Sequence, residues 1–272
     1  MSFNSVPLAA GNIQVRDTEK MVFAPVGASS SCKSDGPAGA SLVLAQSAQV
    51  GERKGIDLRR FFKSFDRVPD PGASYAVQLC TDVPVNHDPT ALVGFMGIEN
   101  AGHTFLVLSK SNGASLVTQS FGFYAARLPS PWHPTRPVPS MIKDNSLHEI
   151  NAAITCCLTG AQFSLLKEKA LQDAGNDYHL VRFNCSDYAL GVYNSVQENP
   201  IILPPYTVTF PGKLKVSSKA AALGLATIGS TPQSLYSTLF SMKNAGGPVA
   251  GNILIDLSED RLAPFSKGEC DE

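Results

Sequence analysis

The chain has 272 residues, 43% of them hydrophobic, with 19 prolines, 22 glycines and a formal net charge of −1. This composition suits a globular protein of one large or two small domains, and it offers no basic surface for nucleic acid. The first residues, MSFNSVPLAAGNIQ, lack the basic start and apolar run of a secretory signal, and no stretch reaches the roughly 18 apolar residues of a membrane-spanning helix. We therefore expect synthesis in the cytoplasm without a signal peptide, no nucleic-acid partner and no stable membrane insertion.

The six cysteines are irregularly spaced and contain no C-x-x-C pair, and the histidines show no H-E-x-x-H motif. Glycine-rich nucleotide motifs are also absent from the sequence. We expect reduced thiols, no metal and no cofactor.

The first part of the chain lacks the regular apolar pattern of a folded domain. GASSSCKSDGPAGAS is typical of turns and linkers, whereas SYAVQLCTDVPV alternates apolar and polar residues as a half-buried strand does. We expect residues 1–72 to be a partly ordered N-terminal extension and the compact domain to begin near Ala73.

The segment GHTFLVLSKSNGASLVTQSFGFY contains two β-rich runs around an Asn-Gly pair, the strongest short-range signal for a hairpin. A two-residue turn at Asn112–Gly113 places His103 opposite Gly122, with Ser120 as a diagonal neighbour on the same face. A slip of one residue would put Gln119 there instead.

Further along the chain, PSPWHPTRPVP predicts a surface loop that carries Trp132, because proline withholds the backbone donor. HEINAAITCCL predicts a strand by its alternation. TGAQFSLLKEKALQDAG predicts a helix over about residues 160–174, because Thr159 and Gln162 have the spacing of a capping box.

The segment RFNCSDYALGVYNSV predicts a helix with Cys185 in its first turn and an apolar stripe behind it. Beyond Asn199 the pattern is weaker, and we expect residues 201–272 to form a C-terminal addition that packs on the core.

A thiol at a helix N-terminus can ionise more easily, because unpaired backbone N–H groups favour the anion there. His103, which follows Gly102 and begins a strand, is the best-placed base, and the N–H groups of the helix start could hold an oxyanion. The alternative is that both residues are ordinary packed side chains, as isolated cysteines and strand histidines often are.

The residues VGFMGIENAGHTFLVL, SFGFYA and NCSDYALGVYN resemble the circularly permuted branch of the papain-like NlpC/P60 superfamily, in which the histidine strand precedes the cysteine helix. The resemblance covers residues 73–200 and implies an α+β, papain-like core, an antiparallel sheet packed against helices. It implies catalytic Cys185 and His103 and a polar third residue that orients the imidazole. Ser120 and Gln119 are the candidates for that residue, with His148 behind them, while Asn184 fixes the nucleophile's loop or contacts substrate.

Relatives in this superfamily cut amide bonds in peptidoglycan stem peptides, so the resemblance implies a cell-wall amidase or endopeptidase. Without a signal peptide, we expect either release on lysis or delivery to the periplasm of a target cell by a specialised secretion machine. An injected toxin would require a cognate immunity protein in the producing cell. A lipid or thioester acyl hydrolase or acyltransferase could use the same Cys-His pair. For the hydrolase we expect Tyr124 and Trp132 to contact the substrate, with Trp132 either the anchor of a lid or a hydrophobic plug of its own loop. A third hypothesis is an inert binding module, in which FGFY and the proline loop form a groove and Cys185 is only a packed side chain.

Overall fold

The structure is a computed structural model that describes residues 55–90, 102–127, 136–204, 206–209, 225–228 and 230–270. The strands are β1 (Ser74–Asp82), β2 (His103–Asn112), β3 (Ser115–Ala125), β4 (Ser140–Asp144), β5 (Ala152–Leu158), β6 (Tyr206–Thr209), β7 (Leu225–Ile228) and β8 (Ile253–Ile255). The helices are α1 (Leu58–Lys63), α2 (Gly160–Asp173), α3 (Cys185–Asn194) and α4 (Pro232–Ala245), with short 3-10 turns at Ser64–Arg67 and Ala250–Asn252.

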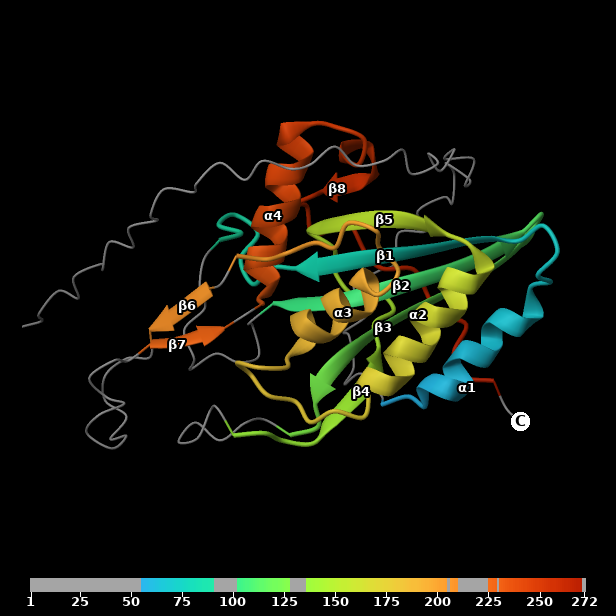
Figure 1. The fold of residues 1–272 in the computed structure, drawn as a ribbon, viewed down its shortest axis with the longest axis horizontal. Helices are drawn as coiled ribbons and strands as arrows, with labels where there is room; N and C mark the ends of the chain where they lie inside the picture. Colours follow the sequence, from blue (N-terminus) through green and yellow to red (C-terminus); the bar gives the residue numbers. More distant parts are fainter. Residues whose placement is uncertain are drawn as a thin grey trace, which may run out of the picture.

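Six of these strands form one antiparallel sheet in the order β4-β3-β2-β1-β5-β8, while β6 and β7 pair separately. The helices α1, α2 and α3 lie against one face of the large sheet (Figure 1). The expected α+β class, with an antiparallel sheet packed against helices, is therefore confirmed.

The hairpin between β2 and β3 is confirmed, but its turn lies one residue later than expected. Asn112 pairs with Ser115, so the turn is Gly113–Ala114, with Gly113 at a φ of 58°. A positive φ at the first turn position suits glycine, which has no Cβ to clash. The Asn112 side-chain amide donates to the carbonyls of Pro69 and Pro71 at 3.1 and 2.8 Å, which holds Asn112 in the strand.

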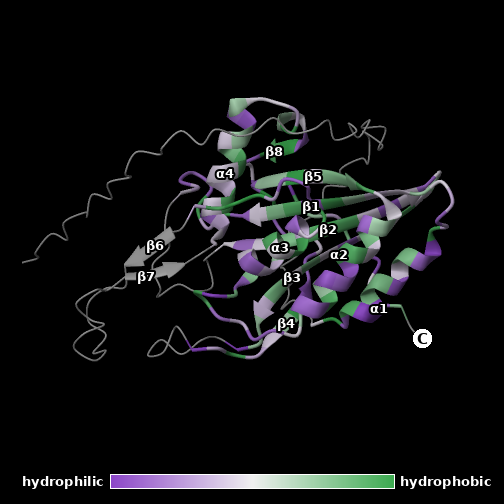
Figure 2. Cartoon of the chain, viewed as in Figure 1, coloured by the Kyte–Doolittle hydropathy of each residue, from purple (hydrophilic) through white to green (hydrophobic). Residues whose placement is uncertain are grey.

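The main core lies between the sheet and the helices. Its aromatic centre joins α1 to β3 and α2: Phe62 packs edge-on against Phe121 at 5.3 Å, and Phe65 packs edge-on against Phe163 at 5.0 Å. Such pairs contribute about 0.5–1.5 kcal/mol each beyond their buried area. Figure 2 shows the apolar central strands and the hydrophilic residues that α2 carries. Because α1 is part of this core, the compact unit begins before Ala73.

The opposite face of the sheet carries a smaller apolar cluster of Cys80, Phe105, Val107, Ile150, Ala153 and Ala263. Ala263 belongs to residues 261–270, which we call the C-terminal strap. The strap runs from the segment before β5 past β3 to α1: the Ala263 N–H donates to the His148 carbonyl at 2.7 Å, the Lys267 N–H to the Thr118 carbonyl at 3.3 Å, and the Cys270 N–H to the Arg60 carbonyl at 3.2 Å.

The C-terminal part of the chain also enters the main sheet and core. β8 pairs with β5, and Leu235, Tyr236 and Leu239 of α4 are buried with the rest of the core. The expectation of reduced thiols is wrong for Cys157, which forms a disulfide, whereas Cys80, Cys156, Cys185 and Cys270 are free.

Candidate functional site

Cys185 is the first residue of α3, as the sequence predicts, and its side chain is buried. Asn184 caps the helix: its side chain accepts from the N–H groups of Ser186 and Asp187, and the Asp187 carboxylate accepts from the Asn184 N–H in return. This capping box satisfies backbone donors that the first helical turn leaves unpaired. Asn184 therefore fixes the backbone on which the thiol sits.

The environment of the thiol favours its protonated form. Burial raises the pKa of the Cys185 thiol above its usual value, while hydrogen bonds from the Thr104 backbone and the Ser186 side chain lower it in part. The expectation that the helix N-terminus lowers this pKa is wrong in net direction, because the desolvation of a buried thiolate outweighs the helix N–H groups. The Tyr178 hydroxyl lies beside the thiol, and burial raises its pKa well above the usual value too.

The His103 imidazole lies on the outer face of the sheet. Its ring stacks on Tyr124, with ring centroids 4.1 Å apart, and it contacts the His148 ring edge-on at 5.3 Å. Its Nε2 atom occupies the space that a side chain at Gly122 would need, since a Cβ there would lie only 2.4 Å away. The pairing of β2 with β3 is observed as far as Leu106 and Phe121. The same register carried three residues further puts Tyr124 opposite His103, in agreement with their ring contact, and the expected partner Gly122 is therefore wrong.

The structure does not bring Cys185 and His103 to one face of the sheet. Successive residues of a strand point to opposite faces, and on β2 it is Thr104 that meets α3, through a 2.8 Å contact between its hydroxyl and that of Ser186. His103 and Phe105 point the other way and lie with His148 on the outer face. The backbone of β2 therefore separates the thiol from the imidazole.

Gly102 allows two segments of the backbone to approach each other closely. A Cβ at this position would lie 2.6 Å from the Asp82 carbonyl oxygen, and its φ is +74°. This glycine lets β2 begin directly beside the end of β1.

Gln119 and Ser120, the expected third catalytic residues, are fully buried and hold the C-terminal strap. The Gln119 amide donates to the Gly268 carbonyl at 3.1 Å and accepts from the Lys267 N–H at 2.9 Å. The Ser120 hydroxyl donates to the Pro264 carbonyl at 3.1 Å. Neither interaction orients an imidazole.

His148 is the candidate that the structure does place beside His103. The Nε2 atom of His148 lies 3.1 Å from the Asp82 carboxylate. Asp82 is the residue of β1 that pairs with His103 of β2. Asn145 donates from its side-chain amide to the Tyr124 hydroxyl at 2.8 Å. The outer face thus gathers two imidazoles, a carboxylate and a phenol.

Trp132, expected in the substrate site, lies outside the described residues, so the groove that it was to form with Tyr124 is not part of the described structure. Sequence reasoning missed Asp82, Asn145 and Tyr178. The correct hairpin and sheet register would have identified Asp82, because it pairs directly with His103.

Within the described part of the chain, no group of three or more His, Cys, Asp or Glu side chains could hold a metal ion. No helix there is long and apolar enough to cross a membrane. Comparisons of the chain with protein-family models, with curated proteins and with solved structures find no match.

Proposed function

We propose that the chain is a cysteine hydrolase of papain-like architecture that cleaves an amide bond in peptidoglycan stem peptides. The position of Cys185 supports this most directly: it is the first residue of a capped helix, and this helix contacts β2, the strand that begins with His103. The order of histidine strand and cysteine helix is the order of the permuted NlpC/P60 enzymes that the sequence resembles.

In the proposed reaction the imidazole takes the thiol proton, and the thiolate sulfur attacks the carbonyl carbon of the scissile amide. The C–N bond then breaks as the imidazolium returns the proton to the leaving amine. Water adds to the thioacyl carbon with the imidazole as base, the C–S bond breaks, and the acid and the free thiol are released.

This reaction requires the side chains of Cys185 and His103 to move from the positions described above. The thiol is buried and its pKa is raised, and His103 lies on the other face of β2. In the proposed mechanism the structure represents the resting enzyme, and substrate binding opens the thiol and turns His103, the first residue of β2, towards α3.

A second candidate is a binding module without catalytic activity. The raised pKa of Cys185 favours it, because a protonated thiol is a poor nucleophile. The packing of His103 between Tyr124 and His148 also favours it, because these contacts keep the imidazole away from the thiol.

The test compares the full-length protein with Cys185→Ala and with the matched control Cys156→Ala, which removes a partly buried thiol on β5. Each is incubated with purified sacculi and, separately, with phospholipid vesicles, and released fragments are identified by mass spectrometry. We expect new amino termini from sacculi with the wild type and the control, and none with Cys185→Ala.

Fatty-acid release from the vesicles alone would replace the amidase proposal with the lipid acyl hydrolase. No release from either substrate would contradict both enzyme proposals and favour the binding module. His103→Gln tests the base: we expect it to abolish release while Cys185 remains open to alkylation in the denatured protein.

A further inference from the structure

The loop that links α2 to α3 lies beside the Cys185 thiol. It comprises residues 174–183, which we call the Tyr178 loop, and it joins the buried Asp173 to the buried Asn184. None of the residues of the loop is itself buried. Segments with few buried side chains open locally at a lower free energy than the whole fold does. The Tyr178 loop can therefore move while the sheet and the helices stay in place.

Tyr178 attaches this loop to the sheet. Its backbone exchanges two hydrogen bonds with that of Val138, at 2.9 and 2.8 Å, and the Ser140 hydroxyl donates to the Asn176 carbonyl at 2.6 Å. The Tyr178 ring stacks on Phe123, with ring centroids 5.7 Å apart and an interplanar angle of 19°. These contacts fix the direction of the phenol, so that its hydroxyl reaches the start of α3.

At the start of α3 the Tyr178 hydroxyl interacts with two groups of Cys185. Its oxygen accepts a hydrogen bond from the Cys185 N–H, and the hydroxyl forms a second hydrogen bond with the thiol. The Asn184 side chain accepts from the next two N–H groups, those of Ser186 and Asp187. The first N–H of the helix is therefore the one that Tyr178 takes, and Cys185 is only 8% exposed.

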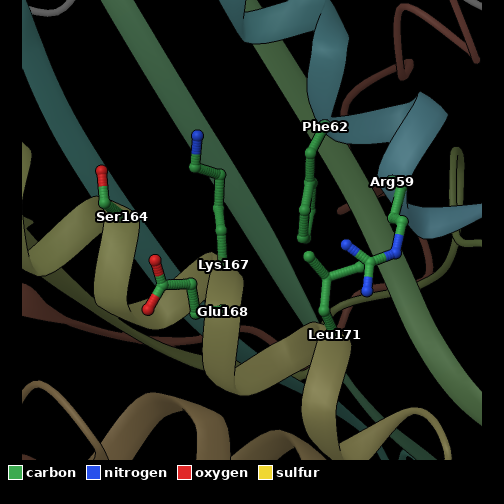
Figure 3. A pocket seen from close by; sticks show the side chains of 6 residues that line it. All are labelled: Arg59, Phe62, Ser164, Lys167, Glu168 and Leu171. Carbon is green, nitrogen blue, oxygen red and sulfur yellow. The ribbon is translucent and has the colours of Figure 1, made fainter.

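The surface depression between α1 and α2 gives no access to this thiol. It is lined by Arg59, Phe62, Ser164, Lys167, Glu168 and Leu171, and by no residue of the Tyr178 loop or of α3 (Figure 3). A substrate for Cys185 needs another way in, and movement of the Tyr178 loop supplies it.

An acyl-transfer site uses backbone N–H groups beside the nucleophile to hold the oxygen of the attacked carbonyl. In this structure the Cys185 N–H already has an oxygen partner, the Tyr178 hydroxyl. We propose that Tyr178 is an autoinhibitory residue, whose phenol fills the place of the substrate carbonyl beside Cys185 until the Tyr178 loop moves away. The inhibitory role rests on the proposed function, whereas the cover of the thiol does not.

The first test measures how well Tyr178 covers the thiol. The full-length wild type and Tyr178→Ala are treated with iodoacetamide under native conditions, and mass spectrometry of the peptides gives the alkylation rate of each free cysteine. We expect Cys185 to react at least tenfold faster in the variant. Cys80, which is fully buried on β1, is the internal control, and its rate should stay the same.

A Cys185 rate that does not increase would overturn the proposal. An equal increase at Cys80 would overturn it as well, because the ring would then stabilise the whole fold and not cover one thiol. Both rates are read without a substrate. A lack of hydrolysis of sacculi would therefore contradict the proposed function and leave the cover of the thiol in place.

The second test addresses the hydroxyl alone. Tyr178→Phe keeps the ring and removes the acceptor of the Cys185 N–H, so hydrogen exchange of this amide should become at least tenfold faster. Nuclear magnetic resonance of protein with isotope-labelled cysteine measures the rate. The matched control is Tyr188→Phe: the Tyr188 ring stacks on the same Phe123, but its hydroxyl donates to the Ala170 carbonyl at 3.1 Å. This control should leave the exchange of the Cys185 amide unchanged, and equal exchange rates in Tyr178→Phe and the wild type would overturn the place assigned to the phenol.

Discussion

Gly122 determines where the His103 imidazole can lie. A Cβ at this position would lie 2.4 Å from His103 Nε2 and 2.8 Å from the Asn145 side-chain oxygen, and it would lie 3.2 Å from the Phe105 Cβ. The absence of a side chain therefore creates the space in which the imidazole stacks on Tyr124.

We predict that Gly122→Ala destabilises the fold by about 1–3 kcal/mol, the usual cost of overpacking a buried site. The added methyl must displace the imidazole or the Asn145 amide. Urea unfolding followed by circular dichroism measures the change. Gly251→Ala is the control, because its Cβ would have no neighbour within 4 Å. Equal unfolding free energies for the two variants would contradict the packing described for His103.

The sequence predicts the placement of Cys185 but not the surroundings of the two residues proposed to orient the base. Cys185 follows a local signal, an Asn cap before an apolar stripe, which the structure confirms. Gln119 and Ser120 bind the C-terminal strap, which lies far along the chain. A polar residue on a strand carries no local sign of so distant a partner.

Among the elements, the start of α3 depends on one buried side chain. Asn184 accepts from the N–H groups of Ser186 and Asp187, and it donates to the carbonyls of Leu180 and Ser230 at 3.1 and 3.0 Å. The Asn184 side chain thus caps α3 and also links the start of α3 to two other segments, the loop at Leu180 and the segment at Ser230 that precedes α4.

We predict that Asn184→Ala lowers the free energy of unfolding by about 2 kcal/mol, the upper end for loss of a helix cap, because buried partners lose their bonds as well. Asn184→Asp keeps the acceptor and loses the donor, so it should fall between the wild type and the alanine variant. Thr159→Ala, at the exposed cap of α2, should cost less than Asn184→Ala. Thermal and urea unfolding rank the variants, and an Asn184→Ala protein as stable as the wild type would refute the role of this cap.

Helices with strong end signals were predictable, whereas strand register was not. α2 begins after Thr159 with the expected capping box and covers Gly160–Asp173, close to the predicted 160–174. The hairpin turn shifted by one residue because Asn112 binds the carbonyls of Pro69 and Pro71, which belong to another segment. Alternation along a strand shows which residues share a face of the sheet, but it does not show which face packs against a helix. For this reason the sequence could not reveal that His103 and Cys185 lie on opposite sides of β2.

Across the whole molecule, two parts of the chain that the sequence presents as peripheral pack against the sheet together with α2 and α3. α1 and the 3-10 turn after it lie within the expected N-terminal extension and supply Phe61, Phe62 and Phe65 to the core. The C-terminal strap reaches α1, where the Ser64 hydroxyl donates to the Gly268 carbonyl at 2.8 Å. The α1 segment IDLRRFFKSF is amphipathic but follows sequence typical of turns and linkers, and the strap is weakly patterned. The place of each in the fold depends on contacts with distant residues, which local sequence does not reveal.

The burial of thiols and phenols in this core links its stability to alkaline pH. Burial raises the pKa of the Cys80 thiol and the Tyr178 hydroxyl well above their usual values, and it also raises those of Cys185 and Tyr193. These groups keep their protons in the folded protein at pH values where the unfolded chain releases them, from about 8.5 for cysteine and about 10 for tyrosine. The unfolded state then binds fewer protons, so stability is fully present below pH 8.5 and falls as the pH rises through these values.

We predict that the free energy of unfolding is nearly constant from pH 7 to 8.5 and then falls, more steeply above pH 10 as tyrosines join the cysteines. Each such group adds a slope of about 1.4 kcal/mol per pH unit once the unfolded chain has lost its proton. Tyr193→Phe removes one of these protons with little change in shape, so its slope above pH 10 should be shallower than that of the wild type by about this amount. Urea titrations at half-unit steps from pH 7 to 11 provide the slopes. A wild-type profile that stays flat to pH 11 would mean that the buried thiols and phenols ionise as easily in the folded chain as in the unfolded one, and would contradict the packed surroundings described for Cys185.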